Sequence, residues 1–334
     1  MSPNQSLPGC MNPRILLDQL CAESAISGST LAARLGVTRA AIWKQVEALR
    51  SCGAPIEAAA GRGYRLSWPI EWLDAARIAA GLDPAQRRRV GDIAVHWQVD
   101  STSSELLRRA AQGGSDLLVC CAESQSAGRG RRGRQWRSPL GGNLYFSLLK
   151  RFDHGMGALS GLSLAVGVAV VDALADCGVG GAGLKWPNDV IARGGKLAGV
   201  LIELGGEFLG PCHAVIGVGI NLRLPAVVAA TIDQPAIDIA TLTGAEPPSR
   251  NRLAGRLLAR LVETVDRFGN AGFAAFRDEY ARHDLLAGQP IRVRDAGGTL
   301  DGTAAGVDER GALRVRHAGG VRLCDSADVS VRAR

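Results

Sequence analysis

The chain has 334 residues, which is enough for two or three domains with one large hydrophobic core among them. Hydrophobic residues make up 46% of it and charged residues 21%, a composition that excludes an intrinsically disordered protein. The net charge of +7 suits a partner rich in phosphate or carboxylate but does not identify one. The longest apolar stretch, residues 156–171, is shorter than the ~20 residues that span a bilayer, so it predicts a buried helix.

The cysteines are scattered and form no Cys-x-x-Cys pair, which predicts a reduced, cytoplasmic protein without a structural zinc site. The first ten residues lack the apolar segment of a secretory signal peptide. Met11 follows a short polar leader, so Met1 and Met11 are both candidates for the native start. The eight cysteines are Cys10, Cys21, Cys52, Cys120, Cys121, Cys177, Cys212 and Cys324.

Residues 1–68 follow the pattern of a winged helix-turn-helix. A short helix that begins after Ser29 and Thr30 is predicted to stop at Gly36, since glycine commonly follows a helix end. Thr38 can cap the next helix, whose apolar residues recur every three to four positions. Two helices joined by a glycine-containing turn indicate a helix-turn-helix. Residues 54–66 then predict a two-stranded wing with a glycine-rich tip.

Residues 69–90 are predicted to be a linker and residues 91–287 the main domain. In the main domain, short apolar strands alternate with glycine turns, while the helices are grouped apart, which is typical of an α+β fold with a largely antiparallel sheet. Residues 288–334 are predicted to form a small β-barrel of short strands. The strands expected in the main domain cover residues 93–99, 117–122, 144–149, 190–192, 197–204 and 214–222, and two helices close it at 253–268 and 273–283.

The first segment that indicates chemistry is Gly128-Arg129-Gly130-Arg131-Arg132-Gly133-Arg134-Gln135-Trp136. Glycines let the backbone approach an anion closely, and guanidinium groups hold phosphate or carboxylate in a bidentate way. We expect this loop to be mobile when empty and ordered by an anionic ligand, because glycine carries large backbone entropy and the arginines repel one another. The alternatives are a solvated basic loop and a nucleic-acid-binding Arg-Gly-Gly tract.

Three other segments are weaker signals taken singly. Lys185-Trp186-Pro187-Asn188-Asp189, with Lys196 soon after, can neutralise a triphosphate and hold Mg²⁺, but Pro-Asn-Asp is also good turn chemistry. Gly217-Val218-Gly219 within a strand indicates a bulge, close ligand approach or simple packing. Residues 100–105 place hydroxyls at a pocket floor, although Thr102 and Glu105 also have the spacing of a capping box.

Together and in this order, these segments closely resemble the bacterial biotin protein ligases, in the form that doubles as a biotin operon repressor. The resemblance spans nearly the whole chain. It implies a winged-helix start, a ligase domain resembling the class II aminoacyl-tRNA synthetases, and an SH3-like C-terminal barrel. The matching stretches are residues 100–102, 123–136, 185–189, 196–203 and 217–221.

The resemblance implies a two-step reaction with biotin and ATP as substrates and Mg²⁺ as the cofactor. Biotin and ATP give biotinyl-5′-adenylate, and a lysine of a biotin carboxyl carrier protein, a subunit of acetyl-CoA carboxylase, then takes the biotinyl group. Other carboxylases are further candidate acceptors. The implied second role is biotin-responsive repression of biotin synthesis genes.

Site residues are carried over from the resemblance position by position. Trp136 is read either as a wall of the pocket or as a core residue. The implied catalytic residues are Arg129, Arg131, Lys185 and Lys196. The implied biotin contacts are Ser101, Thr102, Ser103, Gln125, Arg129, Gly130, Arg131 and Lys196. The implied ATP contacts are Arg131, Arg134, Lys185, Asn188, Asp189 and Asn221, with Asp189 as the Mg²⁺ ligand.

The sequence departs from the family pattern at two places. Ser103 stands where the family has Asn, and its shorter hydroxyl can keep one hydrogen bond, directly or through water. Ala236 and Ile237 stand near the place where a related repressor has a tryptophan beside adenine, so no adenine contact is assigned.

The helix predicted over residues 38–50 is the expected recognition helix. The alternative is a remnant kept for packing or for biotin affinity. Operator binding predicts a dimer, because one such domain reads one half-site. The resemblance implies a monomer without ligand and a homodimer with bound adenylate, which would couple the two sites. The expected DNA contacts are Thr38, Arg39, Trp43, Lys44 and Gln45, with Arg62 on the wing.

Three other functions compete with this interpretation. A lipoate–protein ligase shares the broad fold, but the sequence of the loop at 128–136 argues against it. A non-catalytic biotin-sensing regulator is disfavoured because Arg129, Arg131, Lys185 and Lys196 are all present. An RNA-binding Arg-Gly-Gly protein would need aromatic stacking platforms, and aromatic residues are only 4% of the chain.

Overall fold

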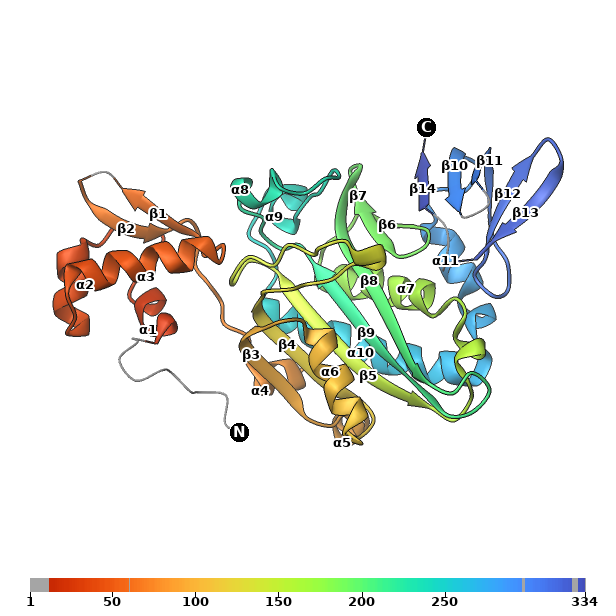
Figure 1. Ribbon diagram of the computed structural model, residues 1–334, viewed down its shortest axis with the longest axis horizontal. Coiled ribbons are helices and arrows are strands. Elements are labelled where there is room, and N and C mark those ends of the chain that lie inside the picture. The colour runs from red at the N-terminus through yellow and green to blue at the C-terminus, as the bar shows by residue number, and fades with distance from the viewer. Residues whose placement is uncertain (1–11, 60, 296–297, 326–329, 334) are drawn as a thin grey trace.

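The computed structural model describes residues 12–59, 61–295, 298–325 and 330–333. The alternative start at Met11 therefore lies outside the described residues. In Figure 1 three parts follow one another across the molecule. A small helical unit with a two-stranded sheet comes first, a large sheet with its helices is in the middle, and a small sheet is at the far side.

The first part is the predicted winged helix-turn-helix. Ser27 caps α2 by accepting from the backbone N–H of Thr30 (3.0 Å), so this helix begins before the expected residues. Gly36 ends it with a left-handed φ of 65°, and Thr38 caps α3 through the N–H of Ala41 (3.1 Å), both as predicted. The elements are α1 Pro13–Asp18, α2 Gly28–Leu35, α3 Arg39–Ser51, β1 Ile56–Ala59 and β2 Gly63–Leu66.

The linker forms two short helices, α4 Ala75–Ala79 and α5 Pro84–Arg89. Asp83 explains why a separate helix, α5, begins at Pro84. Its carboxylate caps α5, while the Gln86 side chain accepts from the Asp83 N–H. The linker lies against the long helix α10 (Arg250–Ala271), since the backbones of Gly81 and Gly255 approach so closely that a Cβ on Gly81 would lie 2.7 Å from Gly255.

The middle part is a seven-stranded sheet in the order β3-β4-β5-β9-β8-β7-β6. Only β3 and β4 pair in parallel, which confirms the largely antiparallel prediction. The unpredicted strand is β6, whose four residues are too short for a clear periodic pattern. The strands are β3 Ile93–Val99, β4 Leu118–Gln125, β5 Leu144–Phe152, β6 Ala182–Lys185, β7 Asp189–Ala192, β8 Gly195–Gly206 and β9 Cys212–Ile220.

Helices cover both faces of this sheet. The long helices α7 and α10 contribute to the main core on one face, while α6 packs on the other through a smaller cluster that includes Leu106, Cys120 and Val215. No described helix is long and apolar enough to cross a membrane. The elements are η1 Arg131–Gly133, η2 Met156–Leu159, η3 Phe273–Phe276, α6 Thr102–Ala111, α7 Leu162–Asp176, α8 Ala226–Ala229, α9 Ile239–Thr243, α10 Arg250–Ala271 and α11 Arg277–His283.

The last part is a small antiparallel sheet in the order β13-β12-β11-β10-β14. Within the described residues the edge strands β13 and β14 do not pair, so this part is an open five-stranded sheet there. Its strands are β10 Pro290–Asp295, β11 Gly298–Val307, β12 Leu313–His317, β13 Gly320–Cys324 and β14 Ser330–Ala333.

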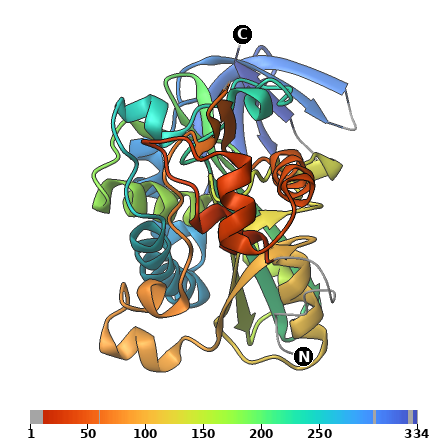
Figure 2. The ribbon, with the colours of Figure 1, turned by 90° about the vertical axis from the view of Figure 1, so that its left-hand side faces the viewer.

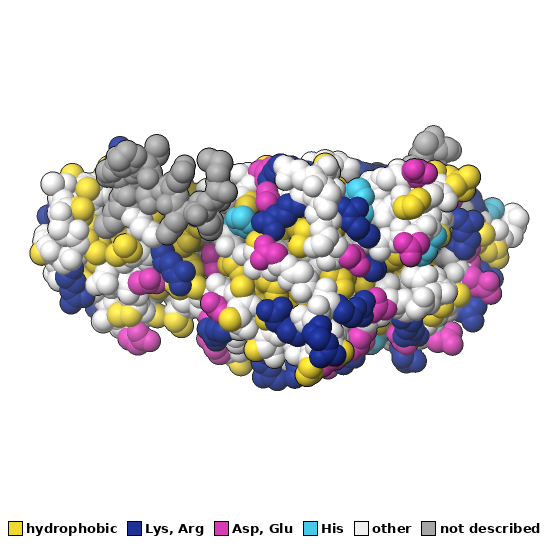
Figure 3. All heavy atoms as spheres, turned by 90° about the horizontal axis from the view of Figure 1, so that it is seen from below, with side chains coloured by type: hydrophobic (Ala, Val, Ile, Leu, Met, Phe, Trp, Pro, Cys, Tyr) yellow, Lys and Arg dark blue, Asp and Glu magenta, His cyan; other side chains and the backbone are white. Residues whose placement is uncertain are grey.

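The winged-helix unit touches the middle part through a few specific contacts, and Figure 2 shows it in front of the large sheet. The N–H of Leu140 donates to the carbonyl of Cys52 (3.1 Å), and Leu140 is buried in the winged-helix core. Trp72 of the linker and Trp97 of β3 also pack against that core, with their ring centres 5.3 Å apart. In Figure 3, basic and acidic side chains are interspersed over the described part of the underside, so the positive charge is not gathered there.

Candidate active site

The site begins at the N-terminus of α6. Ser101 caps this helix through the N–H of Ser104, so the expected capping box of Thr102 and Glu105 is wrong. Glu105 instead pairs with two arginines of its own helix. Asp100 accepts from the N–H of Ser101 (2.8 Å), and its ion pair with Arg108 helps to lower the Asp100 pKa to about 2. The turn that presents Ser101 is thus fixed by a charged side chain.

Three buried hydroxyls lie together behind this turn, and we call Thr102, Ser103 and Ser147 the hydroxyl cluster. Ser147 Oγ lies 2.8 Å from Thr102 Oγ1 and 3.0 Å from Ser103 Oγ. Gln125 Oε1 accepts from the Thr102 N–H (2.9 Å) and hydroxyl (3.3 Å). Each member is at most 5% exposed. The cluster therefore offers polar groups that are already oriented within the protein.

The two glycines of β9 make room for side chains of the site. A Cβ on Gly217 would lie 2.7 Å from Ser103 Oγ, and one on Gly219 would lie 2.5 Å from the Trp136 ring. Both glycines keep regular register with β5 and β8, so the bulge interpretation is wrong. Close packing by the chain's own side chains explains them.

The segment Gly128–Trp136, here called the arginine loop, folds back on itself between these elements. Arg129 and Gln135 form an isolated antiparallel bridge, and the N–H of Gly130 donates to the carbonyl of Arg134 (2.7 Å). Arg132 has a left-handed φ of 57°, which is uncommon for a residue with a side chain. No apolar side chain of this described loop is fully buried. Trp136 is only partly buried, and most of the arginines are exposed.

The Arg129 side chain is held by two groups of the chain itself. Its Nη2 donates to both carboxylate oxygens of Glu203 (2.9 and 3.0 Å), and its Nη1 donates to the hydroxyl of Ser104. An acid of β8 and a hydroxyl of α6 thus occupy donors of Arg129 that a carboxylate or phosphate ligand would use.

Lys196 lies on the other side of the arginine loop. Its Nζ is 2.6 Å from Asp189 Oδ1 and 5.5 Å from the centre of the Trp136 ring. The side chain is only 15% exposed, so this cation is partly desolvated. Asn221 donates from Nδ2 to the carbonyl of Lys196 (3.2 Å), and Asn188 donates to the carbonyl of Val200 (2.7 Å). These amides fix the strand ends around Lys196.

Most of the sequence-predicted residues are therefore brought together, in two groups joined by the arginine loop. Gly128 links them, because a Cβ there would lie 2.9 Å from Gln125 Nε2 and 2.6 Å from the carbonyl of Trp136. Lys185 faces Asp189 across the β6–β7 hairpin. Arg134 is exposed and the structure gives it no side-chain contact with the two groups.

The winged-helix unit presents its predicted contacts separately. Thr38, Arg39 and Lys44 are exposed on or just before α3, and Arg62 is exposed on the wing. Trp43 is 60% exposed although it is large and apolar, whereas Gln45 is partly buried. An exposed helix with cationic and aromatic side chains suits a nucleic-acid groove.

Comparison with known proteins matches three segments of the chain to known families. Residues 97–221 match the biotin/lipoate A/B protein ligase family, residues 15–65 match a helix-turn-helix domain, and residues 287–332 match the biotin protein ligase C-terminal domain. The bifunctional ligase/repressor BirA of Salmonella typhimurium is 35% identical over 96% of this chain and 98% of its own length. The chain belongs to the biotin protein ligase family.

Other relatives agree with this membership. The bifunctional ligase/repressor BirA of Escherichia coli is 35% identical over 92% of this ligase and 93% of its own length. A solved structure of the Aquifex aeolicus biotin protein ligase in complex with biotin and ATP has a TM-score of 0.61 and 27% identity. It covers 73% of this chain and 99% of its own.

Sequence reasoning missed three residues of this ligase that the structure connects to the site. Ser147 was detectable as the one polar side chain in the apolar run 144–149. Glu203 lies at the end of a family-like stretch, but nothing local indicates that it reaches Arg129. Asn143 is fully buried next to Asn221, which only the fold reveals.

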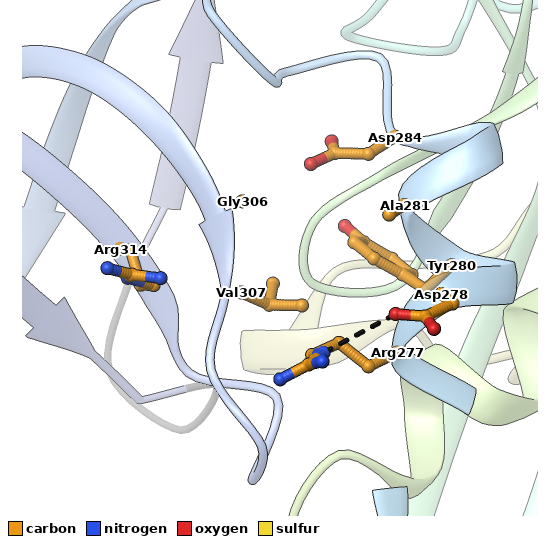
Figure 4. Close-up of a pocket in the computed structure, with 8 residues that line it drawn as sticks. All are labelled: Arg277, Asp278, Tyr280, Ala281, Asp284, Gly306, Val307 and Arg314. Atoms are coloured by element: carbon orange, nitrogen blue, oxygen red, sulfur yellow. Dashed lines mark ion pairs between the residues drawn. The ribbon is translucent and has the colours of Figure 1, made fainter. Parts of the chain in front are cut away.

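A separate hollow of about 220 Å³ lies between α11 and the C-terminal sheet of this ligase (Figure 4). Within the described residues the buried hydroxyl of Tyr280 has no hydrogen-bond partner, and burial raises the pKa of Asp284. Arg277 and Asp278 form an ion pair at its rim. The hollow is lined by none of the sequence-predicted site residues, so it is not assigned to the active site.

Proposed function

We propose that this chain activates biotin with ATP and transfers the biotinyl group to a lysine of a biotin carboxyl carrier protein, the carrier subunit of acetyl-CoA carboxylase. The observation that carries this proposal is the position of the arginine loop, between the hydroxyl cluster and the Lys196–Asp189 pair. The 35% identity with ligase/repressors over nearly the whole chain supports it.

In the first half-reaction, an oxygen of the biotin carboxylate attacks the α-phosphorus of ATP. The bond from that phosphorus to the bridging oxygen breaks, and pyrophosphate leaves. The protein contributes mainly orientation and charge neutralisation. Arg129 and Arg131 hold the carboxylate and then the adenylate phosphate, and Lys196 neutralises charge where the two reactants meet. Glu203 must release Arg129 for this role.

In the second half-reaction, the amine of the carrier lysine attacks the carbonyl carbon of biotinyl-5′-adenylate. AMP leaves with the electron pair of the carbon–oxygen bond, and the amine gives up a proton. Adenylation makes this step feasible, because a free carboxylate is a poor electrophile.

The two substrates are assigned to the two groups of the site. The head group of biotin is held by buried hydroxyls and an amide, and the triphosphate by cations and amides near the β6–β7 hairpin. Ser103 keeps a hydrogen bond to Ser147 although the family has Asn there. The biotin contacts are Ser101, Thr102, Ser103, Gln125, Arg129, Gly130, Arg131 and Lys196, and the ATP contacts are Arg131, Arg134, Lys185, Asn188, Asp189 and Asn221.

Mg²⁺ is proposed as the ion that accompanies ATP, with Asp189 as its protein ligand. The described residues contain no group of three or more acidic, histidine or cysteine side chains that could hold a metal alone. One carboxylate fits Mg²⁺, since this ion keeps several waters and takes most other oxygens from phosphates. Asp189 must then leave Lys196, which frees that ammonium for the substrates.

A second role as biotin-responsive repressor is favoured by the exposed recognition helix α3, offered to operator DNA. Operator binding by one reading domain per chain requires a dimer. We propose a monomer without ligand and a homodimer with adenylate, in the cytoplasm, with the division 1–68, 69–90, 91–287 and 288–334. The dimer dissociation constant should fall when adenylate is bound, and an unchanged constant contradicts this coupling.

Biotin-dependent exchange of pyrophosphate into ATP tests the ligase assignment. We expect exchange with biotin, none with lipoate, and a loss of about two orders of magnitude in Arg131→Ala. Exchange with lipoate instead would favour the lipoate ligases. Measurable biotin binding without any exchange would favour a non-catalytic biotin-sensing regulator and overturn the catalytic assignments.

A further inference from the structure

A buried guanidinium connects the linker to the main sheet. Arg250, the first residue of α10, is 5% exposed. Its Nη1 donates to Glu123 Oε2 (2.6 Å) and to the carbonyl of Glu71 (2.8 Å). Its Nε and Nη2 donate to the carbonyl of Asn143 (3.1 and 2.8 Å). Arg250 therefore holds three separate segments together inside the protein.

The ion pair with Glu123 does not by itself explain why an arginine is there. Glu123 is 3% exposed and also accepts from the N–H of Leu73 (2.7 Å), so both charges are compensated. Burying such a pair costs desolvation energy, and well-packed apolar residues commonly replace one without loss of stability. A role in positioning its partners accounts better for this arrangement.

The partner that leads toward the site is Asn143, which is fully buried before β5. Its Oδ1 accepts from the N–H groups of Leu222 (3.0 Å) and Arg223 (3.3 Å). Its Nδ2 donates to Asn221 Oδ1 (3.4 Å). Asn221 in turn donates to the carbonyl of Lys196 (3.2 Å). A chain of hydrogen bonds thus runs from Arg250 through Asn143 to Asn221, a proposed ATP contact, and from Asn221 to the backbone of Lys196.

We propose that Arg250 and Asn143 are positioning residues for ATP: Arg250 fixes the Asn143 backbone, and the Asn143 amide sets the orientation of Asn221 and the start of the Lys196 strand. This inference rests on the proposed function, in which Asn221 contacts ATP. Neither residue touches a substrate.

The effect is confined to the ATP side by the pattern of hydrogen bonds. Within the described chain, the hydroxyl cluster bonds to itself and to Gln125, and the structure gives no hydrogen bond from it to Arg250 or Asn143. Displacing the Asn143 amide therefore alters the surroundings of Asn221 without removing a hydrogen bond of the hydroxyl cluster.

Two variants test the positioning role. Asn143→Asp keeps an acceptor for the two backbone N–H groups but replaces the donor to Asn221 with a carboxylate oxygen, which repels Asn221 Oδ1. Arg250→Lys keeps the charge beside Glu123 but cannot bond to Glu71 and Asn143 at once. Ser249→Ala is the matched control, because Ser249 bonds to Glu71 in the same region without reaching Asn143.

Pyrophosphate exchange is measured at varied ATP and varied biotin, with thermal unfolding of each variant. We expect the KM for ATP to rise about tenfold in Asn143→Asp and Arg250→Lys, while the KM for biotin changes less than about twofold. In Ser249→Ala the KM for ATP and the KM for biotin should equal those of the wild-type protein. If Arg250→Lys fails to fold, Asn143→Asp decides.

Asn221→Ala separates this inference from the proposed function. If Asn221→Ala leaves the KM for ATP unchanged, the ATP role of Asn221 is wrong. If Asn221→Ala raises it but Asn143→Asp does not, the positioning inference is overturned. A lower unfolding temperature with wild-type KM values, or an equal rise in both KM values, also overturns it, because a structural role alone predicts those results.

Discussion

The hydroxyl cluster and the arginine loop, which we propose bind the two ends of biotin, are built in opposite ways. The hydroxyl cluster is buried between α6 and the sheet, and each of its members has a partner within the protein. The arginine loop is largely exposed and rich in glycine, and its Arg129 is bound to Glu203. We infer that the polar head-group site is formed before ligand arrives, whereas the anion site is assembled by the ligand.

This difference follows from the chemistry of the two ends of biotin. A neutral ring gains from fixed hydrogen-bond partners, because buried polar groups left unpaired are costly. A carboxylate needs cations, and unpaired cations held close together would repel one another before the ligand arrives. Internal acids solve that problem here, since Glu203 and Asp189 neutralise Arg129 and Lys196.

The largest expected effect is on the reaction itself. Lys196→Met removes the ammonium that neutralises the reacting groups, and we expect pyrophosphate exchange to fall by about two to three orders of magnitude. Lys150→Met is the matched control, because Lys150 pairs with Asp116 in another part of the sheet. If pyrophosphate exchange falls by less than about threefold in Lys196→Met, the proposed role of Lys196 is wrong.

The next largest effect is expected in the hydroxyl cluster, the part of the site that we infer to be formed before the ligand binds. Ser147→Ala leaves Thr102 and Ser103 without their shared partner, and we expect the KM for biotin to rise about tenfold with little change in the KM for ATP. Ser160→Ala, which removes a hydroxyl bonded to the carbonyl of Arg310, should change neither. An equal rise in the KM values for biotin and ATP would mean that the hydroxyl cluster does not act on biotin alone.

A smaller effect, a gain in affinity for biotin, is expected when the acid that pairs with the arginine loop is neutralised. Glu203→Gln keeps the shape of the side chain but removes the charge that competes for Arg129. Because the pair is partly exposed, we expect biotin to bind only about two- to fivefold more tightly. Calorimetry at two salt concentrations checks this, since the gain should shrink as salt rises. Weaker binding would show that Glu203 helps the ligand.

The smallest effect concerns pH. His96 lies on β3, its Nε2 is buried without a partner in the described chain, and burial lowers its pKa below the usual 6.5, despite nearby Glu105 and Asp92. The unfolded chain therefore binds the proton more readily. Stability from neutral His96 is full above about pH 6.5 and is lost as the pH falls below that value.

Thermal unfolding at pH 7.5 and pH 5.5 measures this loss. His96→Gln should reduce the decrease in unfolding temperature between the two pH values. If the unfolding temperature of His96→Gln falls between pH 7.5 and pH 5.5 by as much as that of the wild-type protein, His96 is not the source of the pH dependence.

The sequence was sufficient where signals were local. The end of α2 at Gly36, the Thr38 cap of α3, the wing and the mainly antiparallel sheet follow from turn residues and short periodic patterns. It was not sufficient where several side chains compete for one partner, or where a contact is long-range. At the start of α6 the competition is local, because Arg108 and Arg109 of the same helix bind Glu105, and Ser101 becomes the cap in place of Thr102.

The candidate site divides in the same way. The arginine loop and the Lys185–Asp189 segment are recognisable as sequences. The bonds from Arg129 to Glu203 and from Asn143 to Asn221 join residues 74 and 78 positions apart, so no local pattern predicts them.

Hydrogen–deuterium exchange of the full chain tests the comparison most directly, with and without biotin and ATP. Peptides covering the arginine loop, residues 128–136, should become strongly protected when both substrates are present. Peptides from β4 and β5, which carry Gln125 and Ser147, should already be protected without ligand and change little. A loop that is equally protected without ligand, or strands that gain protection as much as the loop does, would contradict the division into a preformed half and a ligand-assembled half.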